Sequence, residues 1–170
     1  MSNTCTKPMY IEQPLTQIMQ KVPCGQCIGC RLEKAGQWAT RCYHEAQLYD
    51  QNSFITLTYA PKYLPDDLSV NKGAITRFIR RLRRKNPEKE IRFYGCGEYG
   101  ENFGRPHYHL VLFNHDFEDK VLLRGAQFKT LKNHFKKGPI CDLYRSPTLE
   151  KLWPYGFSTI GEVTFDSAGS

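Results

Sequence analysis

Residues 95–113 constrain this chain more than any other stretch, because they predict a β-hairpin with a strongly patterned second strand. The first strand leads into a Gly-rich turn, and the second begins His-Tyr-His and continues Leu-Val-Leu-Phe. Side chains alternate between the faces of a strand, so His107 and His109 lie on one face and Tyr108 on the other. Two imidazoles about 7 Å apart along one strand can close on a single metal ion.

The turn between the strands predicts what faces the two histidines. If the hairpin loop is roughly symmetric, Glu98 pairs with His107 and Cys96 pairs with His109, all on one face. One carboxylate and two imidazoles would then converge and leave coordination positions for water or a phosphate oxygen, as metal-assisted phosphoryl chemistry requires. The alternative is a pair of partly buried histidines that are hydrogen-bonded to neighbouring groups.

Composition narrows the class of protein and of partner. A chain of 170 residues, 40% of them hydrophobic, is long enough for one domain with a real core. The formal net charge of +7 favours a polyanionic partner, although a moderate positive charge also serves solubility. The sequence contains no run near the ~20 apolar residues of a membrane span and no apolar signal core in residues 1–14, so we expect neither membrane insertion nor secretion.

The seven cysteines therefore favour reduced thiols or metal ligation over a disulfide framework. Three of them, Cys24, Cys27 and Cys30, have the spacing C-x2-C-x2-C, and the intervening glycines permit a tight turn around Zn²⁺. We weigh this second metal site equally against a turn whose small thiols pack on a sheet. Three candidates for a fourth ligand stay open: Cys5, Cys42 and His44.

The N-terminal part of the chain is expected to hold an irregular arm and then a helix. Residues 1–22 are interrupted by prolines, which break helices. Residues 30–49 carry apolar side chains every three or four positions, including Leu32, Ala39 and Cys42, which is typical of a core-facing helix.

Alternation and helix-capping signals predict the remaining elements. Strands are expected at 53–59, 90–98, 107–113 and 157–165. Helices are expected at 71–86, with Asn71 as the N-cap, and at 146–153, with Ser146 as the N-cap. Residues 116–123 can begin a helix or a short strand, and 129–137 predict a basic helix.

The predicted helix at 71–86 carries a dense run of cations. Six positive side chains within nine residues can neutralise phosphates and release counterions, although a solvated helix face is the usual fate of such a run. The run consists of Arg77, Arg80, Arg81, Arg83, Arg84 and Lys85.

Three stretches of this sequence resemble a known family. His107-Tyr108-His109 looks like the HUH motif of HUH endonucleases, and residues 54–59 resemble the first motif of rolling-circle replication initiators. Residues 23–31, 97–109 and 152–157 together resemble the replication-initiation proteins of gokushovirus-type Microviridae, which are small single-stranded DNA phages. The resemblance covers most of residues 20–166.

The resemblance implies an α+β fold, similar to the RRM fold, with a central antiparallel sheet of about five strands and packed helices. It implies that Glu98, His107 and His109 hold a divalent metal, Mg²⁺ or Mn²⁺, that polarises a phosphate. A tyrosine of such an initiator attacks single-stranded origin DNA and forms a 5′-phosphotyrosyl adduct, and the free 3′-OH primes replication. The implied partners are the origin DNA and the host replication machinery, and the implied location is the host cytoplasm.

The nucleophile is the part of the family pattern that this sequence lacks. The family's Tyr-x-x-x-Lys or Tyr-x-x-x-Tyr motif follows the last strand, so we expect the catalytic tyrosine beyond Ser170. We interpret residues 23–166 as an endonuclease domain that stops before that helix, preceded by the arm, and expect this chain to bind metal without cleaving DNA. The one Tyr-x-x-x-Tyr match, Tyr59 to Tyr63, precedes the metal strand and is interpreted as coincidence.

Two other functions stay open at this point. The same sheet can serve as a non-catalytic module that binds single-stranded nucleic acid through aromatic and basic side chains. The chain can also be a structural protein that is organised by zinc at the cysteines.

Overall fold

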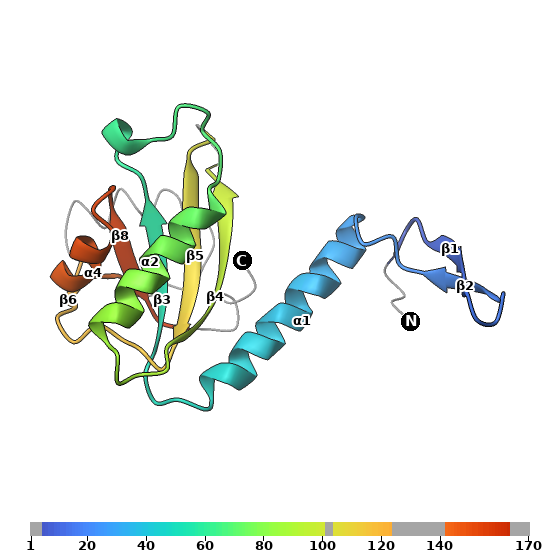
Figure 1. Cartoon of the computed structure of the whole chain (residues 1–170), viewed down its shortest axis with the longest axis horizontal. Helices are drawn as coiled ribbons and strands as arrows, with labels where there is room; N and C mark the ends of the chain where they lie inside the picture. Colours follow the sequence, from blue (N-terminus) through green and yellow to red (C-terminus); the bar gives the residue numbers. More distant parts are fainter. Residues whose placement is uncertain (1–4, 101–103, 124–141, 164–170) are drawn as a thin grey trace. The chain divides into compact units, whose positions relative to one another are not determined.

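The computed structural model describes residues 5–100, 104–123 and 142–163 (Figure 1). The chain divides into two compact units, one that extends to His44 and one that begins at Glu45. The first unit holds a β-hairpin and most of helix α1. The second unit holds a sheet and its packed helices.

The first unit corrects the expectation of an irregular arm at residues 1–22. Strands β1 (Met9–Glu12) and β2 (Met19–Val22) form an antiparallel hairpin in which Met9 pairs with Val22. Prolines lie just outside the strands, where their missing N–H breaks no ladder hydrogen bond, so Pro8, Pro14 and Pro23 bound the strands instead of excluding them.

Helix α1 (Ile28–Ala46) is present where the periodicity predicts it, but it is not the core-facing helix that we expected. Of its predicted apolar stripe, Ala39 and Cys42 are buried, whereas Leu32 is exposed, and so is Tyr43 beside the stripe. Periodicity shows which side chains can share a face of a helix. It does not show whether another element covers that face.

The second unit confirms the α+β architecture with a six-stranded antiparallel sheet of order β4-β5-β3-β8-β7-β6. The strands are β3 (Asn52–Thr58), β4 (Arg92–Tyr99), β5 (Pro106–Phe113), β6 (Val121–Leu122), β7 (Tyr144–Arg145) and β8 (Ser158–Gly161). The short strand considered within 116–123 exists as β6. Sequence patterns missed β7, because two residues cannot show alternation. The basic helix predicted at 129–137 lies outside the described residues, as do 164 and 165 at the end of the predicted last strand.

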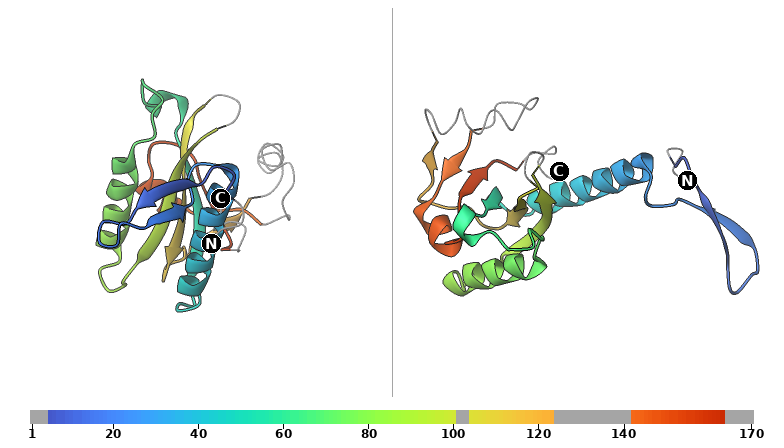
Figure 2. Two further views of the ribbon diagram at one scale, coloured as in Figure 1. Left: turned by 90° about the vertical axis from the view of Figure 1, so that its right-hand side faces the viewer. Right: turned by 90° about the horizontal axis from the view of Figure 1, so that it is seen from above.

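Helix α2 (Lys72–Lys85) and the short helix α4 (Pro147–Leu152) pack on one face of this sheet (Figures 1 and 2). A short 3-10 turn, η1 (Pro61–Tyr63), lies between β3 and α2. Both predicted caps are confirmed, because the Asn71 side chain accepts a hydrogen bond from the Gly73 N–H and the Ser146 side chain accepts one from the Leu149 N–H. None of the helices that the structure describes is long and apolar enough to cross a membrane.

The core lies between α2, α4 and the strand residues that face them. Strand β3 contributes Ile55 and Leu57, and α2 contributes Phe78 and Leu82, all fully buried. Trp153, just after α4, is also fully buried and donates from its indole N–H to the Thr58 carbonyl at 2.9 Å. Because strand side chains alternate, this packing leaves the intervening residues of β3, β4 and β5 on the opposite face.

Candidate metal centre

The face of the sheet opposite α2 carries two rows of side chains that run across its strands. The observed register pairs Glu98 with His107 and Cys96 with His109, as the hairpin pattern predicts. Strand β3 extends both rows, since Thr58 pairs with His107 and Thr56 pairs with His109. Directly paired residues of antiparallel strands point to the same face, so the rows are continuous.

The metal-ligand atoms of three of these side chains converge. Glu98 Oε2 lies 3.1 Å from His109 Nε2 and 3.7 Å from His107 Nε2. The two imidazole rings are nearly perpendicular, at 88°, with centroids 5.2 Å apart. Each of the three residues offers a ligand atom within 4.8 Å of the other two. The structure therefore brings together the three ligands that the sequence predicts, although no observation tests whether they bind metal.

The far ring nitrogen of each histidine has its own contact. His107 Nδ1 lies 3.1 Å from the Arg105 carbonyl, which can only accept, so Nδ1 carries the proton and Nε2 keeps its lone pair. His109 Nδ1 lies 3.1 Å from the Thr56 hydroxyl, and the His109 ring stacks on Phe54 with centroids 5.6 Å apart. Such contacts fix the tautomer and orientation of metal-binding histidines.

The electrostatics of the cluster suit a cation. Burial, and secondarily the neighbouring His107, lower the pKa of His109, so its imidazole is neutral at pH 7 and can act as a ligand. The Glu98 side chain is 55% exposed, whereas those of His107 and His109 are 20% and 14% exposed, so the ligands line a surface site that is accessible from the carboxylate side. Burial raises the pKa of Cys96, which keeps that neighbouring thiol protonated.

The cations predicted to contact DNA lie on the other layer. Helix α2 packs through Phe78, Ile79 and Leu82 against the sheet face that presents Tyr108, and the Asn71 N–H donates to the Tyr108 hydroxyl at 3.0 Å. His107 and His109 point away from that face. The structure therefore does not bring Arg77, Arg80, Arg81, Arg84 or Lys85 to the candidate metal centre.

Two α2 cations make contacts within the fold. Arg83 donates to the Ile91 carbonyl at 2.7 Å from Nη2, and Arg81 donates to the Tyr155 hydroxyl at 3.5 Å while lying over that ring. Arg80, Arg84 and Lys85 are exposed. The interpretation of this run as a phosphate-binding surface therefore depends on the exposed members, together with Arg77.

Sequence reasoning missed three residues of the site face. Thr56, Thr58 and Phe157 carry no motif, and the alternation of residues 53–59 places the threonines on one face without showing which strands lie beside them. Phe157 extends the His107 row, because it and Thr58 exchange two backbone hydrogen bonds of 2.9 and 3.1 Å. Its side chain is 69% exposed. Gly156 permits this close approach, since a Cβ there would lie 2.2 Å from the Thr58 carbonyl oxygen.

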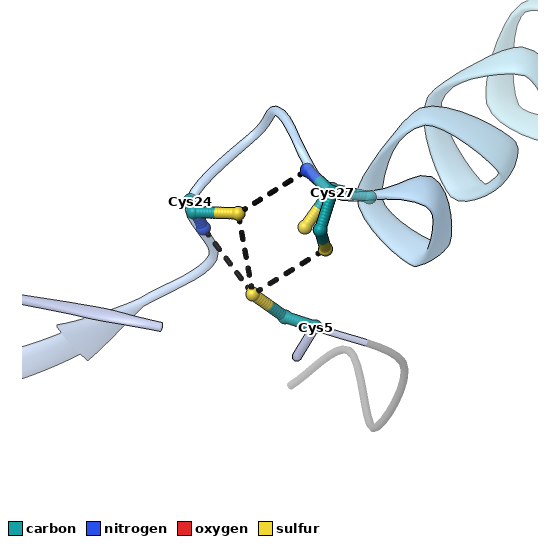
Figure 3. Close-up of side chains that lie close together, drawn as sticks. Cys5, Cys24 and Cys27 are labelled. Atoms are coloured by element: carbon teal, nitrogen blue, oxygen red, sulfur yellow. Dashed lines mark hydrogen bonds between the residues drawn. The ribbon is translucent and has the colours of Figure 1, made fainter. Parts of the chain in front are cut away.

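The cysteine cluster forms a second convergent group in the first unit. Cys5 joins Cys24, Cys27 and Cys30, so the structure selects Cys5 among the three candidates for a fourth ligand (Figure 3). Backbone hydrogen bonds, first from Cys30, lower the pKa of Cys27 to about 5. Cys42 and His44 lie further along α1 and are not part of this group among the described residues.

Fold and site together define an α+β protein whose antiparallel sheet presents a carboxylate and two imidazoles on an open face. The family model for replication-associated protein ORF2 and its relatives matches residues 52–170. The chain therefore belongs to this family of replication-associated proteins. The matched region contains Glu98, His107 and His109 and every strand of the six-stranded sheet.

Curated relatives come from small phages. The chain is 34% identical over 153 residues to the replication-associated protein VP4 of Bdellovibrio phage phiMH2K, covering 86% of this chain and 45% of that protein. It is 33% identical over 159 residues to replication-associated protein ORF2 of Spiroplasma virus 4, covering 89% and 46%. It is 30% identical over 149 residues to replication-associated protein ORF4 of Chlamydia phage 1, covering 84% and 35%.

These matches confirm the resemblance to replication proteins of gokushovirus-type phages. The chain spans less than half the length of the curated relatives that it matches. No solved structure matches the chain.

Proposed function

We propose that this chain provides the metal-binding half of a centre that nicks and rejoins single-stranded origin DNA in rolling-circle replication of a phage. The observation that carries the proposal is the convergence of Glu98 Oε2 with the Nε2 atoms of His107 and His109 on an exposed sheet face. Membership in a family of replication-associated proteins supports a DNA substrate.

The donor set suits a divalent cation such as Mn²⁺ or Mg²⁺, which would supply Lewis-acid polarisation of a phosphate oxygen. Glu98 provides the negative charge, and the two imidazoles provide neutral donors. The Arg105 carbonyl and the Thr56 hydroxyl hold the rings so that both Nε2 lone pairs point toward Glu98. The side chains of this chain would thus position one phosphate at the sheet surface.

In the proposed reaction, a tyrosine oxygen forms a bond to the scissile phosphorus, and the bond from phosphorus to the 3′ oxygen breaks. The tyrosine loses a proton and the departing 3′ oxygen gains one. The products are a 5′-phosphotyrosyl adduct and a free 3′-OH, which the host replication machinery would extend. Reversal by a later 3′-OH rejoins the strand.

We propose that the attacking tyrosine is supplied from outside the described residues. Tyr59 and Tyr108 lie on the α2 face and their hydroxyls are 3.3 Å apart, and burial raises the pKa of Tyr59 far above its ordinary value. Tyr94 shares the site face by register, since it pairs with Val111. A covalent DNA adduct on the 170-residue chain, mapped to Tyr94 or any other tyrosine, would contradict this assignment.

Metal binding is tested by titrating the chain with Mn²⁺ and following free Mn²⁺ by electron paramagnetic resonance. The double variant His107→Ala, His109→Ala is expected to lose the site, while His44→Ala, an exposed histidine on α1, is expected to retain it. In a relative that carries the tyrosine motif, the matching double variant should lose both cleavage and the covalent adduct. Unchanged Mn²⁺ binding in the double variant of this chain would overturn the proposal.

A non-catalytic module that binds single-stranded nucleic acid is the second candidate. The exposed Phe157 at the end of the His107 row favours it, because exposed aromatic rings stack on bases. Under this alternative, DNA binding persists and no Mn²⁺ site is found at the two histidines.

A further inference from the structure

We propose that Cys5, Cys24, Cys27 and Cys30 bind one structural Zn²⁺ ion that holds the N-terminal hairpin to the start of α1. The four thiols come from three separate segments of the first unit. Cys5 precedes β1, Cys24 follows β2, and Cys27 and Cys30 flank the first residues of α1. This site is independent of the nicking function proposed above.

The sulfur positions fit a single tetrahedral ion. Cys5 Sγ lies 3.7 Å from Cys24 Sγ and 3.9 Å from Cys27 Sγ, and all four sulfurs lie within 4.8 Å of one another (Figure 3). Zinc–sulfur bonds of about 2.3 Å in a regular tetrahedron place the sulfurs about 3.8 Å apart. A disulfide needs about 2.05 Å, so these pairs are not bonded to each other.

The spacing also argues against an iron–sulfur cluster. Three cysteines in the pattern C-x2-C-x2-C occur in ferredoxin-type sites, where several iron atoms separate the thiolates. Sulfurs that nearly touch leave room for one ion only. Four thiolates without a carboxylate or open position favour a closed structural zinc site over a catalytic one.

Backbone N–H groups already point at the sulfurs as they do around metal-bound thiolates. The Cys24 N–H donates to Cys5 Sγ, and the Cys27 N–H donates to Cys24 Sγ, both at 3.4 Å. Gly25 lies between them with φ of +72°, in the left-handed region that lets the chain turn back within three residues. The N-terminus of α1 adds its partial positive charge beside Cys27 and Cys30.

The hairpin needs such a tie, because it has no core of its own. No residue from Cys5 to Gly29 is buried, and the strands expose Met9, Tyr10, Ile11 and Met19. An isolated two-stranded hairpin is marginally stable in water at best. Metal binding that links its two ends to α1 would supply the missing free energy of folding.

Zinc content of the purified, reduced chain tests the site. We expect one zinc per chain, lost in Cys5→Ser and in Cys24→Ser and retained in Cys5→His, since imidazole can replace a thiolate. Cys96→Ser is the matched cysteine control, and the double variant His107→Ala, His109→Ala is the control for zinc held at the other centre. Both controls should retain the zinc. A zinc content that is zero in the wild-type chain, or equal in wild type and Cys24→Ser, would overturn the proposal.

Cobalt substitution and hydrogen exchange give readouts that misfolding alone would not produce. Co²⁺ bound by four thiolates shows intense sulfur-to-metal charge-transfer absorption, which should disappear in Cys5→Ser. Removing zinc with a chelator should abolish amide protection in β1 and β2 and leave β3 and β5 protected. A metal-free chain whose hairpin amides stay protected would contradict the proposed role of the ion.

Discussion

The contact between Thr56 and His109 is the residue-scale feature that is easiest to isolate. Thr56 Oγ1 is the neighbour at 3.1 Å that orients His109 Nδ1, and Thr56 itself offers no ligand to the three-residue cluster. We therefore expect Thr56→Val to weaken Mn²⁺ binding by about 10-fold to 100-fold, the usual cost of losing a contact behind a metal ligand. Isothermal titration of the chain with Mn²⁺ measures this.

Thr58→Val is the matched control on the same strand and the same face. The Thr58 hydroxyl donates to the Phe157 carbonyl at 3.2 Å, so its loss should leave the Mn²⁺ affinity within about 2-fold. Thr56→Ser should restore most of the affinity. Equal effects of the two valine substitutions would mean that Thr56 acts through packing alone.

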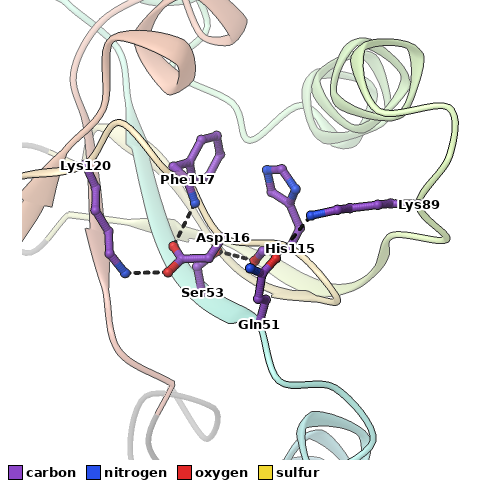
Figure 4. A network of polar contacts seen from close by, with 7 residues as sticks. All are labelled: Gln51, Ser53, Lys89, His115, Asp116, Phe117 and Lys120. Carbon is purple, nitrogen blue, oxygen red and sulfur yellow. Dashed lines mark hydrogen bonds and ion pairs between the residues drawn. The ribbon is translucent and has the colours of Figure 1, made fainter.

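His115 gives the fold a pH dependence that is separate from the site. It lies against the Phe117 ring, and neither of its buried ring nitrogens has a hydrogen-bond partner among the described residues (Figure 4). Burial, and secondarily the nearby Lys89 charge, lower its pKa below the ordinary 6.5, while Asp116 and Glu118 act in the opposite sense. The unfolded chain therefore takes up this proton at a higher pH than the folded chain does.

The free energy of unfolding should thus be fully present above pH 6.5 and should fall as the pH drops below that value. Urea unfolding of the sheet unit at several pH values from 7.5 to about 5 measures the trend. In His115→Phe, the part of the decline that begins below 6.5 should be smaller, whereas His44→Ala should follow the wild type. An unchanged profile in His115→Phe would assign the decline to other groups.

At the scale of elements, the rows across β4, β5, β3 and the start of β8 link the metal cluster to an aromatic side chain. Phe157 ends the row that contains Thr58 and His107. Strands are about 4.8 Å apart, so its ring stands about 10 Å from His107, within reach of a base next to a bound phosphate. Base stacking on one aromatic ring contributes about 1–3 kcal/mol.

We therefore expect Phe157→Ala to weaken binding of short single-stranded DNA by about 5-fold to 150-fold, without loss of Mn²⁺ binding. Fluorescence anisotropy with a labelled oligonucleotide measures the affinity. Phe157→Trp should keep it, and Val121→Ala, at another highly exposed apolar side chain, should have no effect. Equal binding by Phe157→Ala and wild type would exclude stacking at this position.

The elements differ in how far the sequence could predict them. The register of β4 with β5 follows from a symmetric turn between two patterned strands, so Glu98 and His107 were correctly paired from local pattern alone. The pairing of β3 with both β5 and β8 joins residues about 50 and 100 positions apart, and no local pattern contains it. Thr56 and Phe157 become part of the site through those pairings, which is why sequence reasoning missed them.

The cysteine cluster shows the same limit in another form. The spacing of Cys24, Cys27 and Cys30 is local and visible, whereas Cys5 reaches them because β1 and β2 fold back as a hairpin. That hairpin was missed because its side chains are exposed and do not alternate between buried and solvent-facing positions. A metal can replace a hydrophobic core, and then hydrophobic patterning carries little information about the fold.

At the scale of the whole molecule, charge and site are distributed over different surfaces. The formal net charge is +7, yet α2, which carries the densest run of cations, covers the sheet face opposite Glu98, His107 and His109. A DNA strand with one phosphate at the metal centre can meet α2 only by continuing around the sheet. Affinity from α2 and metal binding at the centre should therefore be separable.

The salt dependence of DNA binding separates them. In the double variant Arg80→Gln, Arg84→Gln, the slope of log affinity against log salt should decrease in magnitude by about 1.4, since each single-strand phosphate contact contributes about 0.7. Mn²⁺ affinity should stay unchanged, because both arginines lie on the α2 layer. The matched control Arg31→Gln, Lys34→Gln removes two exposed cations from α1 and should leave the slope unchanged. A slope that the α2 variant does not alter would make these arginines a solvated helix face, and the polyanion contacts would then have to come from cations nearer the metal centre.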